Sequence, residues 1–169
     1  MDRLAIVIVT FKRQELLGCL FDSIAGLTVA PWRIVVVDNE NSTKTAQMVA
    51  DFSTRLTEQW GQTSSEPDSD GGTERVVYDP QETNTGGSGG FSEGVRRAFE
   101  LGAEWFWVMD DDVAVLPEAL ERLEPWSAHY DVVQGQRYDY DSTPFFWQHH
   151  FMTSLCIYNP LSRAGFNGA

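Results

Sequence analysis

The chain is poor in cysteine and in basic side chains, and it lacks a long apolar run. Its two cysteines, Cys19 and Cys156, lie far apart among 169 residues, which argues against a disulfide framework and fits a reducing compartment. Twelve Lys and Arg stand against 25 Asp and Glu, a net charge of −13 that would repel nucleic acid. The apolar run 4–9 is too short for a signal peptide or a membrane span. We therefore expect a cytoplasmic globular protein that does not bind nucleic acid.

Short apolar runs alternate with segments of helical spacing. The continuous β-branched runs 4–9 and 34–37 are typical of parallel strands that are covered on both faces. Apolar residues at helical spacing predict helices between them and after them. The other strands are predicted at 75–78, 105–109 and 131–133, and the helices at 16–24, from 43, from 91 and near 117. This alternation predicts an α/β fold with a mostly parallel sheet flanked by helices, in a single domain over residues 1–169.

Polar side chains gather after four of the predicted strands. They are Thr10 to Arg13, Asp38 to Ser42, Asn84 to Gly90, and Asp110 to Asp112. Each cluster alone also fits a capping or turn role, because strand ends and helix starts favour Asp, Asn, Ser and Gly. Ligands of open α/β sheets bind at the carboxyl ends of strands. The four clusters together therefore predict a binding site at that edge.

The acidic triplet Asp110, Asp111 and Asp112 is the sharpest of these signals. Three adjacent carboxylates repel one another and require a nearby positive charge. In an extended backbone Asp110 and Asp112 point to one side and Asp111 to the other, so the first and third can share a ligand. Hard oxygen ligands suit Mg²⁺ or Mn²⁺, which would also hold a diphosphate. An acidic loop before the next helix remains an equal alternative for an isolated triplet.

The glycine stretch 84–90 can bring backbone N–H groups close to a phosphate or a sugar. It lacks the lysine of a P-loop, and it does not follow the first strand as a dinucleotide fingerprint does. A flexible turn is an equally good interpretation of the stretch alone. Asp38 is also open to two interpretations, as a capping residue or as a contact to a ribose or base.

Taken in order, these motifs resemble the inverting family 2 glycosyltransferases with the GT-A fold. The resemblance covers most of residues 4–137. It rests on the segments Ile8 to Arg13, Val36 to Ser42, Asn84 to Phe91 and Met109 to Asp112. The glycine-rich third segment is similar to that of galactofuranosyl- and rhamnosyltransferases of bacterial cell-wall synthesis. The implied reaction moves a sugar from a nucleoside diphosphate to a glycan or lipid-linked acceptor, with galactofuranose from UDP-galactofuranose as the first choice and rhamnose from dTDP-rhamnose as the alternative.

The resemblance also implies roles for individual residues. Thr10, Phe11 and Arg13 would contact the base and ribose, and Asp38 would bind the base or ribose. The donor would be framed by Asn84, Gly86 and Gly87, with Asp110 and Asp111 also counted among the nucleotide-sugar contacts. Asp110 and Asp112 match the first and third positions of the metal motif for Mg²⁺ or Mn²⁺, with Asp112 favoured as the direct ligand. That cation would offset the charge on the departing nucleoside diphosphate.

An inverting transfer also needs a base that deprotonates the acceptor. In the family this base is an Asp or Glu well downstream of the metal motif, whereas the late carboxylates Asp139 and Asp141 come too early. We therefore expect the base beyond Ala169, and expect the chain to be the donor half of a longer polypeptide. A lipid-linked acceptor would bring it to the inner face of the plasma membrane without a span of its own.

Four other classes of protein remain as alternatives. Sugar nucleotidyltransferases carry a glycine-rich loop directly after the first strand, and residues 10–13 contain no glycine. Phosphoaspartate receivers place paired acids after the first strand, whereas here the acids follow the fourth. A nucleotide-sugar binding module without turnover would bind the donor and release no sugar, and a purely structural domain would bind no nucleotide.

Overall fold

The protein is described from a computed structural model that covers residues 1–63, 73–139, 141–142, 149–152 and 157–160. The chain divides into two compact units, Met1–Tyr130 and Asp131–Ala169, which we describe separately. The expectation of a single domain over residues 1–169 therefore stays a prediction.

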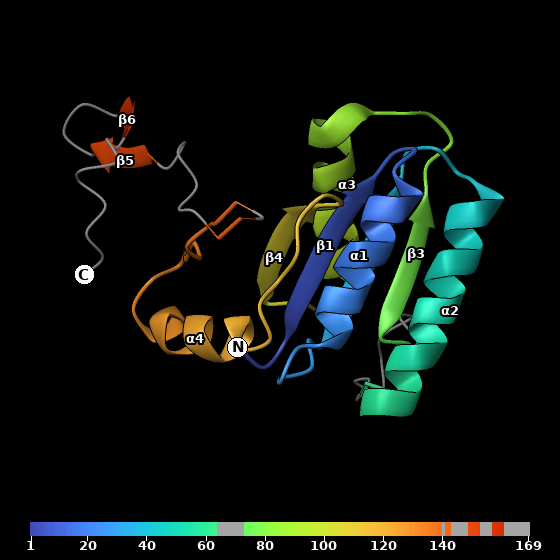
Figure 1. Cartoon of the computed structure of the whole chain (residues 1–169), viewed down its shortest axis with the longest axis horizontal. Coiled ribbons are helices and arrows are strands. Elements are labelled where there is room, and N and C mark those ends of the chain that lie inside the picture. Colours follow the sequence, from blue (N-terminus) through green and yellow to red (C-terminus); the bar gives the residue numbers. More distant parts are fainter. Residues whose placement is uncertain (64–72, 140, 143–148, 153–156, 161–169) are drawn as a thin grey trace. The chain divides into compact units, whose positions relative to one another are not determined.

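The first unit is built on a parallel four-stranded sheet (Figure 1). Its strands are β1 (Leu4–Thr10), β2 (Arg33–Asp38), β3 (Val76–Pro80) and β4 (Trp105–Asp110), in the spatial order β3-β2-β1-β4. The β-branched runs of β1 and β2 fill the centre of the sheet, where every residue of both strands is buried. The predicted α/β class and parallel sheet are confirmed.

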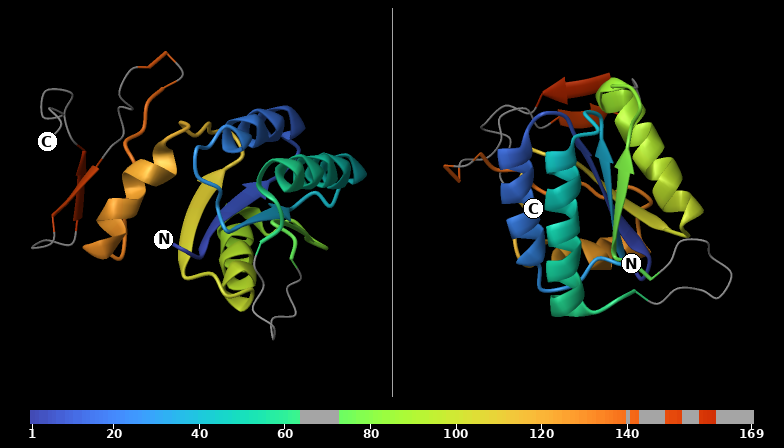
Figure 2. Two further views of the ribbon diagram at one scale, coloured as in Figure 1. Left: turned by 90° about the horizontal axis from the view of Figure 1, so that it is seen from below. Right: turned by 90° about the vertical axis from the view of Figure 1, so that its right-hand side faces the viewer.

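Helices cover both faces of this sheet, as the two views in Figure 2 show. On one face, α1 (Gln14–Ala25) and α2 (Thr43–Trp60) pack on alternate β1 residues, such as Ile6 and Ile8. On the other face, α3 (Gly86–Glu100) packs on the residues between them, such as Val7 and Val9. Because side chains alternate along a strand, the continuous apolar run supplies both layers of the core.

Two glycines let α3 approach the sheet closely. A Cβ atom at Gly90 would stand 2.6 Å from Val9 Cγ1, and one at Gly94 would stand 2.5 Å from Val7 Cγ1. Such distances are far below van der Waals contact, so glycine is required at both positions. The glycine-rich stretch therefore lies largely within the first turns of α3 rather than in a loop before the helix.

After β4 the chain runs back along α1. The Val115 N–H donates to Ser23 Oγ at 3.1 Å, and the Thr28 N–H donates to the Pro117 carbonyl at 2.9 Å. The short helix α4 (Ala119–Leu123) then buries Leu120 in the core, and the 3₁₀ helix η1 (Glu124–Ala128) follows it. The helix that the sequence predicts near 117 therefore exists, although it has only five residues.

The strand predicted at 131–133 is wrong. These residues form no strand, and Val132 is 86 % exposed. The second unit instead holds a short antiparallel pair, β5 (His149–Met152) with β6 (Ile157–Pro160). No helix in the described part of the chain is long and apolar enough to cross a membrane.

Candidate functional site

All four strands end at one edge of the sheet because they are parallel. Thr10 at the end of β1 pairs in register with Asp38, Asp38 pairs with Pro80, and Val9 pairs with Asp110. The polar segments that follow the strands therefore start from neighbouring positions. The structure thus brings together the four clusters that the sequence places after strands.

The acidic triplet divides into one buried and two exposed side chains. Asp111 is 3 % exposed, whereas Asp110 and Asp112 are exposed to solvent. Asp111 accepts a 2.7 Å hydrogen bond from the hydroxyl of Thr10, which is itself buried. Asp111 and Asp112 lie in a turn rather than in an extended strand. Asp111 is nevertheless buried while its two neighbours are exposed, which is the difference that alternation predicts.

Arg13 lies against this triplet. Its Nη1 atom is 2.9 Å from Asp112 Oδ2 and 3.3 Å from Asp111 Oδ1. The backbone of Arg13 is fixed at the start of α1, where its carbonyl accepts the Leu17 N–H. Half of the Arg13 side chain is exposed. The structure therefore places Arg13 on the carboxylates, and its predicted contact with a base or ribose stays a prediction.

The rest of the segment after β1 is exposed. Phe11 is 39 % exposed, and the ammonium of Lys12 lies 5.1 Å from the centroid of its ring. Lys12 has a φ of 59°, a left-handed conformation that turns the chain sharply between β1 and α1. The aromatic ring is thus available to a ligand, whereas the hydroxyl of Thr10 is already committed to Asp111.

The electrostatics of the triplet favour a cation. Partial burial raises the pKa of Asp110, and the neighbouring Asp112 and Asp111 carboxylates raise it further, while Arg13 lowers it. Crowded carboxylates hold their negative charge at a cost, which a nearby cation relieves.

Asp38 is fully buried, and its carboxylate is occupied by the protein itself. Oδ1 accepts the Glu40 N–H at 2.9 Å, and Oδ2 accepts the Ser42 N–H at 3.0 Å and the Tyr78 hydroxyl at 2.8 Å. Burial and this hydrogen bond raise the pKa of Tyr78. Asp38 therefore shapes the loop after β2, and the predicted direct contact with a base or ribose stays a prediction.

Tyr78 helps to hold the Asp38 carboxylate, a role that the sequence did not predict. It stands on β3, in register with Val36 of β2, and its partly buried side chain reaches Asp38 through the hydroxyl. Sequence offered no signal for it, because an aromatic residue in a strand is ordinarily a packing residue.

Asn39 belongs to the polar cluster predicted after β2, although no individual role was predicted for it. It joins the loop after β2 to the start of α3. It is 5 % exposed, its Nδ2 donates to the Gly86 carbonyl at 3.2 Å, and its Oδ1 accepts from the Thr85 N–H and hydroxyl at 3.3 Å. Asn84 Oδ1 accepts the Gly86 N–H at 2.8 Å. This bonding fixes the backbone around the glycines.

Gly86 and Gly87 are exposed at the start of α3. Gly86 has a φ of +68°, and a Cβ atom at either glycine would meet nothing within 4 Å. The space around these two residues is therefore open to a ligand, unlike that around Gly90. Val9 connects this helix start to the acidic triplet, because it packs on Gly90 and pairs in register with Asp110.

The donor set at this edge fits a divalent cation that also binds a diphosphate. Mg²⁺ is ordinarily held by one or two carboxylates together with substrate phosphates and waters. Asp110 and Asp112 supply two exposed carboxylates of that kind. Among the residues that the structure describes, no group of three or more His, Cys, Asp or Glu side chains could hold a metal ion by itself.

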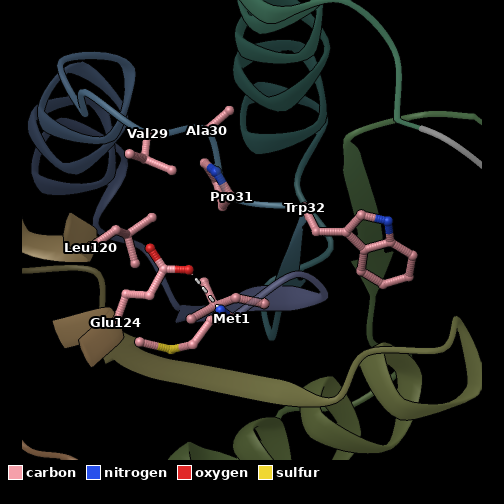
Figure 3. Close-up of a pocket in the computed structure, with 8 residues that line it drawn as sticks. Met1, Val29, Ala30, Pro31, Trp32, Leu120 and Glu124 are labelled. Carbon is pink, nitrogen blue, oxygen red and sulfur yellow. Dashed lines mark hydrogen bonds and ion pairs between the residues drawn. The ribbon is translucent and has the colours of Figure 1, made fainter. Parts of the chain in front are cut away.

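Figure 3 shows a cavity at the opposite, amino-terminal edge of the sheet. Its volume is about 30 Å³, enough for one or two waters and far too small for a nucleotide. The Met1 amino group forms an ion pair with Glu124 beside it. The cavity is lined by Met1, Leu4, Val29, Ala30, Pro31, Trp32, Leu120 and Glu124. This cavity is therefore not an alternative ligand site to the carboxyl edge of the sheet.

Comparison with known families shows to which family the chain belongs. The model of the family described as "Glycosyl transferase family 2" matches residues 5–166. The chain belongs to glycosyl transferase family 2. The predicted resemblance is confirmed, and the sheet with its flanking helices is the GT-A-like fold of this family.

Curated relatives of this family 2 chain are galactofuranosyltransferases. One from Mycolicibacterium smegmatis, GlfT1, is 34 % identical over 106 residues, which are 63 % of this chain and 28 % of that protein. GlfT1 from Mycobacterium tuberculosis is 30 % identical over 108 residues, covering 63 % of this chain and 29 % of that protein. The chain thus spans less than a third of the length of these relatives.

Solved structures of similar fold include two complexes with nucleotide-sugars. TarS residues 1–349 from S. aureus, in complex with UDP-GlcNAc, has a TM-score of 0.55 at 18 % identity, covering 75 % of this chain and 32 % of that chain. The mannosyltransferase PcManGT from Pyrobaculum calidifontis, in complex with GDP-Man and Mn²⁺, has a TM-score of 0.55 at 17 % identity, with coverage of 75 % and 32 %. At these identities the likeness establishes the fold.

Proposed function

We propose that the carboxyl edge of this family 2 domain binds a nucleotide-sugar and a divalent cation, and that it serves an inverting glycosyl transfer. The observation that carries the proposal is the pair of exposed carboxylates, Asp110 and Asp112, at the end of β4. The exposed glycines that begin α3 lie at the same edge, where the Gly86 carbonyl accepts from Asn39 directly after β2. The open space beside Gly86 and Gly87 suits the close approach of a donor.

In this proposal the cation is held by Asp110 and Asp112 and by the diphosphate. When bound, it offsets the charge that develops on the departing nucleoside diphosphate. The chain's own residues do the positioning. Asp111 is anchored on Thr10, so the turn that follows Asp110 and carries Asp112 is fixed to β1.

The preferred donor is UDP-galactofuranose, with Mg²⁺ or Mn²⁺. The identity to galactofuranosyltransferases supports this sugar, and the donors bound in structures of similar fold support a nucleotide-sugar. The alternatives are dTDP-rhamnose as donor, and a binding module without turnover. The acceptor is a glycan or lipid-linked glycan. The catalytic base that deprotonates this acceptor lies outside the described site.

Calorimetry of UDP and dTDP binding, with Mn²⁺ and then with EDTA, tests the proposal. We expect UDP to bind with Mn²⁺ and to lose most of its affinity in EDTA or in Asp112→Asn. Asp2→Asn removes the same charge at the amino-terminal edge and should bind UDP as the parent does. Equal affinity with and without the cation would contradict the proposed metal site.

Release of sugar separates the enzyme from a binding module. With UDP-galactofuranose and Mn²⁺, slow hydrolysis of the donor requires a working site for the leaving group, whereas a binding module leaves the donor intact. Hydrolysis of dTDP-rhamnose in preference to UDP-galactofuranose would instead establish the alternative donor.

A further inference from the structure

Arg13 already pairs with Asp112, one of the two carboxylates at which the proposed site places a divalent cation. One guanidinium nitrogen, Nη1, bridges Asp112 Oδ2 at 2.9 Å and Asp111 Oδ1 at 3.3 Å. A divalent cation at Asp112 and the Arg13 guanidinium would therefore compete for the same negative charge.

The two carboxylates that Arg13 bridges differ in how firmly they are held. Asp111 is buried and also accepts the Thr10 hydroxyl, so it keeps a partner when Arg13 leaves. The Asp112 side chain is 46 % exposed, and that of Arg13 is 52 % exposed. Ion pairs between such exposed groups are weak and exchange readily. The bond between Arg13 and Asp112 is therefore the one that a cation can replace.

The position of Arg13 also lets its side chain move while its backbone stays. The residue stands at the start of α1, where its carbonyl accepts the Leu17 N–H at 3.0 Å. The long side chain makes no helix-capping bond there. A guanidinium released from Asp112 thus remains at the edge of the sheet, and guanidinium groups bind phosphate oxygens strongly.

We propose that Arg13 is an exchangeable counter-ion of this site. It holds Asp112 while the donor is absent, and it passes to a diphosphate oxygen of the nucleotide-sugar when the cation takes Asp112. This positioning role rests on the proposed function. Its consequence is that Arg13 opposes binding of the cation alone and favours binding of the cation together with a nucleoside diphosphate.

Lys12 provides a matched control for this proposal. It carries the same charge in the same segment, but its ammonium lies over the Phe11 ring. Lys12→Gln and Arg13→Gln therefore remove one positive charge each, and only the second removes the bridge to Asp111 and Asp112. A difference in Mn²⁺ affinity between the two variants therefore reports the contact of Arg13 with the carboxylates, because both variants change the net charge equally.

Binding of Mn²⁺ alone, followed by electron paramagnetic resonance without nucleotide, tests the exchange. We expect Arg13→Gln to bind Mn²⁺ about two- to fivefold more tightly than the parent, the range that a weak exposed ion pair predicts. Lys12→Gln should change this affinity less. With saturating Mn²⁺, Arg13→Gln should bind UDP more weakly than the parent. Mn²⁺ affinities that are equal in Arg13→Gln and Lys12→Gln would overturn the proposal.

Asp112→Asn in the same titration distinguishes the two possible failures. If it binds Mn²⁺ as the parent does, the metal site is wrong and the proposed function fails with it. If Asp112→Asn loses Mn²⁺ binding while Lys12→Gln and Arg13→Gln have equal Mn²⁺ affinities, only the exchange by Arg13 is overturned. Should Arg13→Gln not fold, Arg13→Lys replaces it. Lysine keeps the charge without the planar fork, so we expect Arg13→Lys to bind Mn²⁺ more tightly than the parent and to bind UDP more weakly. An unchanged UDP affinity would overturn the proposal.

Discussion

The hydroxyl of Thr10 donates a 2.7 Å hydrogen bond to the carboxylate of Asp111, across 101 positions of sequence. Both residues are 3 % exposed, so this bond is made inside the protein. It joins the end of β1 to the turn after β4. The position of the two exposed carboxylates therefore depends on a residue of another strand.

Replacing Thr10 by valine should loosen this turn. Thr10→Val keeps the side-chain shape but leaves a buried carboxylate oxygen without its donor, at a cost of about 1–3 kcal/mol in the free energy of unfolding. Thr10→Ser keeps the hydroxyl and should lose less. Urea denaturation measures the stability, and Mn²⁺ titration measures the site. A Thr10→Val protein as stable as the parent would contradict the role given to this bond.

Adding a methyl group at Gly94 should destabilise the fold. The new Cβ would stand 2.5 Å from Val7 Cγ1 and 2.9 Å from Val37 Cγ2, so α3 must move away from the sheet. Overpacking of this kind costs about 1–3 kcal/mol. Gly87→Ala is the matched control, because its Cβ meets nothing within 4 Å and alanine favours the helix. Thermal unfolding of both variants checks the difference.

Gly87→Ala also tests whether a donor approaches the start of α3. If the backbone there contacts the nucleotide-sugar, the variant should bind UDP more weakly while its melting temperature stays at or above that of the parent. Unchanged UDP affinity would remove Gly87 from the predicted frame of the donor. Calorimetry with Mn²⁺ present measures this affinity.

Removing the Tyr78 hydroxyl should weaken the loop after β2. Tyr78→Phe takes one of three donors from the buried Asp38 carboxylate, and hydrogen bonds to charged groups contribute about 1.5–3 kcal/mol. Tyr130→Phe is a suitable control because Tyr130 is 58 % exposed. Chemical denaturation compares the two proteins. Equal stabilities would show that the other two donors suffice for Asp38.

The stability of the fold should also depend on the ionisation of Asp79 on β3. Burial raises the pKa of Asp79, with a further contribution from Glu93, and its Oδ2 has no hydrogen-bond partner in the described part of the chain. Since the folded chain holds this proton more tightly than the unfolded chain, stability is lost as the pH rises through the folded pKa. Asp79→Asn should therefore be more stable than the parent at pH 7.

Melting temperatures from pH 7 down to about pH 4, the usual range of an aspartate, check this sign. The advantage of Asp79→Asn should shrink as the pH falls, because the parent then carries a protonated Asp79 as well. Asp51→Asn, an exposed change on α2, is the control and should show no such dependence. An advantage that grows toward low pH would contradict the assignment.

Local patterns predicted the central strands correctly, but they also predicted a strand at 131–133 that does not form. Residues 4–9 and 34–37 are β-branched throughout, and their burial on both faces follows from that composition alone. Val132 and Val133 carry the same local preference, yet a strand forms only where a partner supplies its hydrogen bonds, and short runs do not reveal that partner.

The sequence by itself determined the α/β layering, the family, and the placement of acidic and glycine-rich segments after strands, because periodicity and residue order are local properties. Only the tertiary structure decided which of these side chains are bonded within the protein and which are open to a ligand. Thr10 and Asp111 bind each other, Asp38 is enclosed by its own loop and Tyr78, and Arg13 lies on the acids. The physical reason is that strand register and helix packing join residues tens of positions apart, and a hydrogen bond made inside the fold removes a polar group from the surface that a ligand can reach.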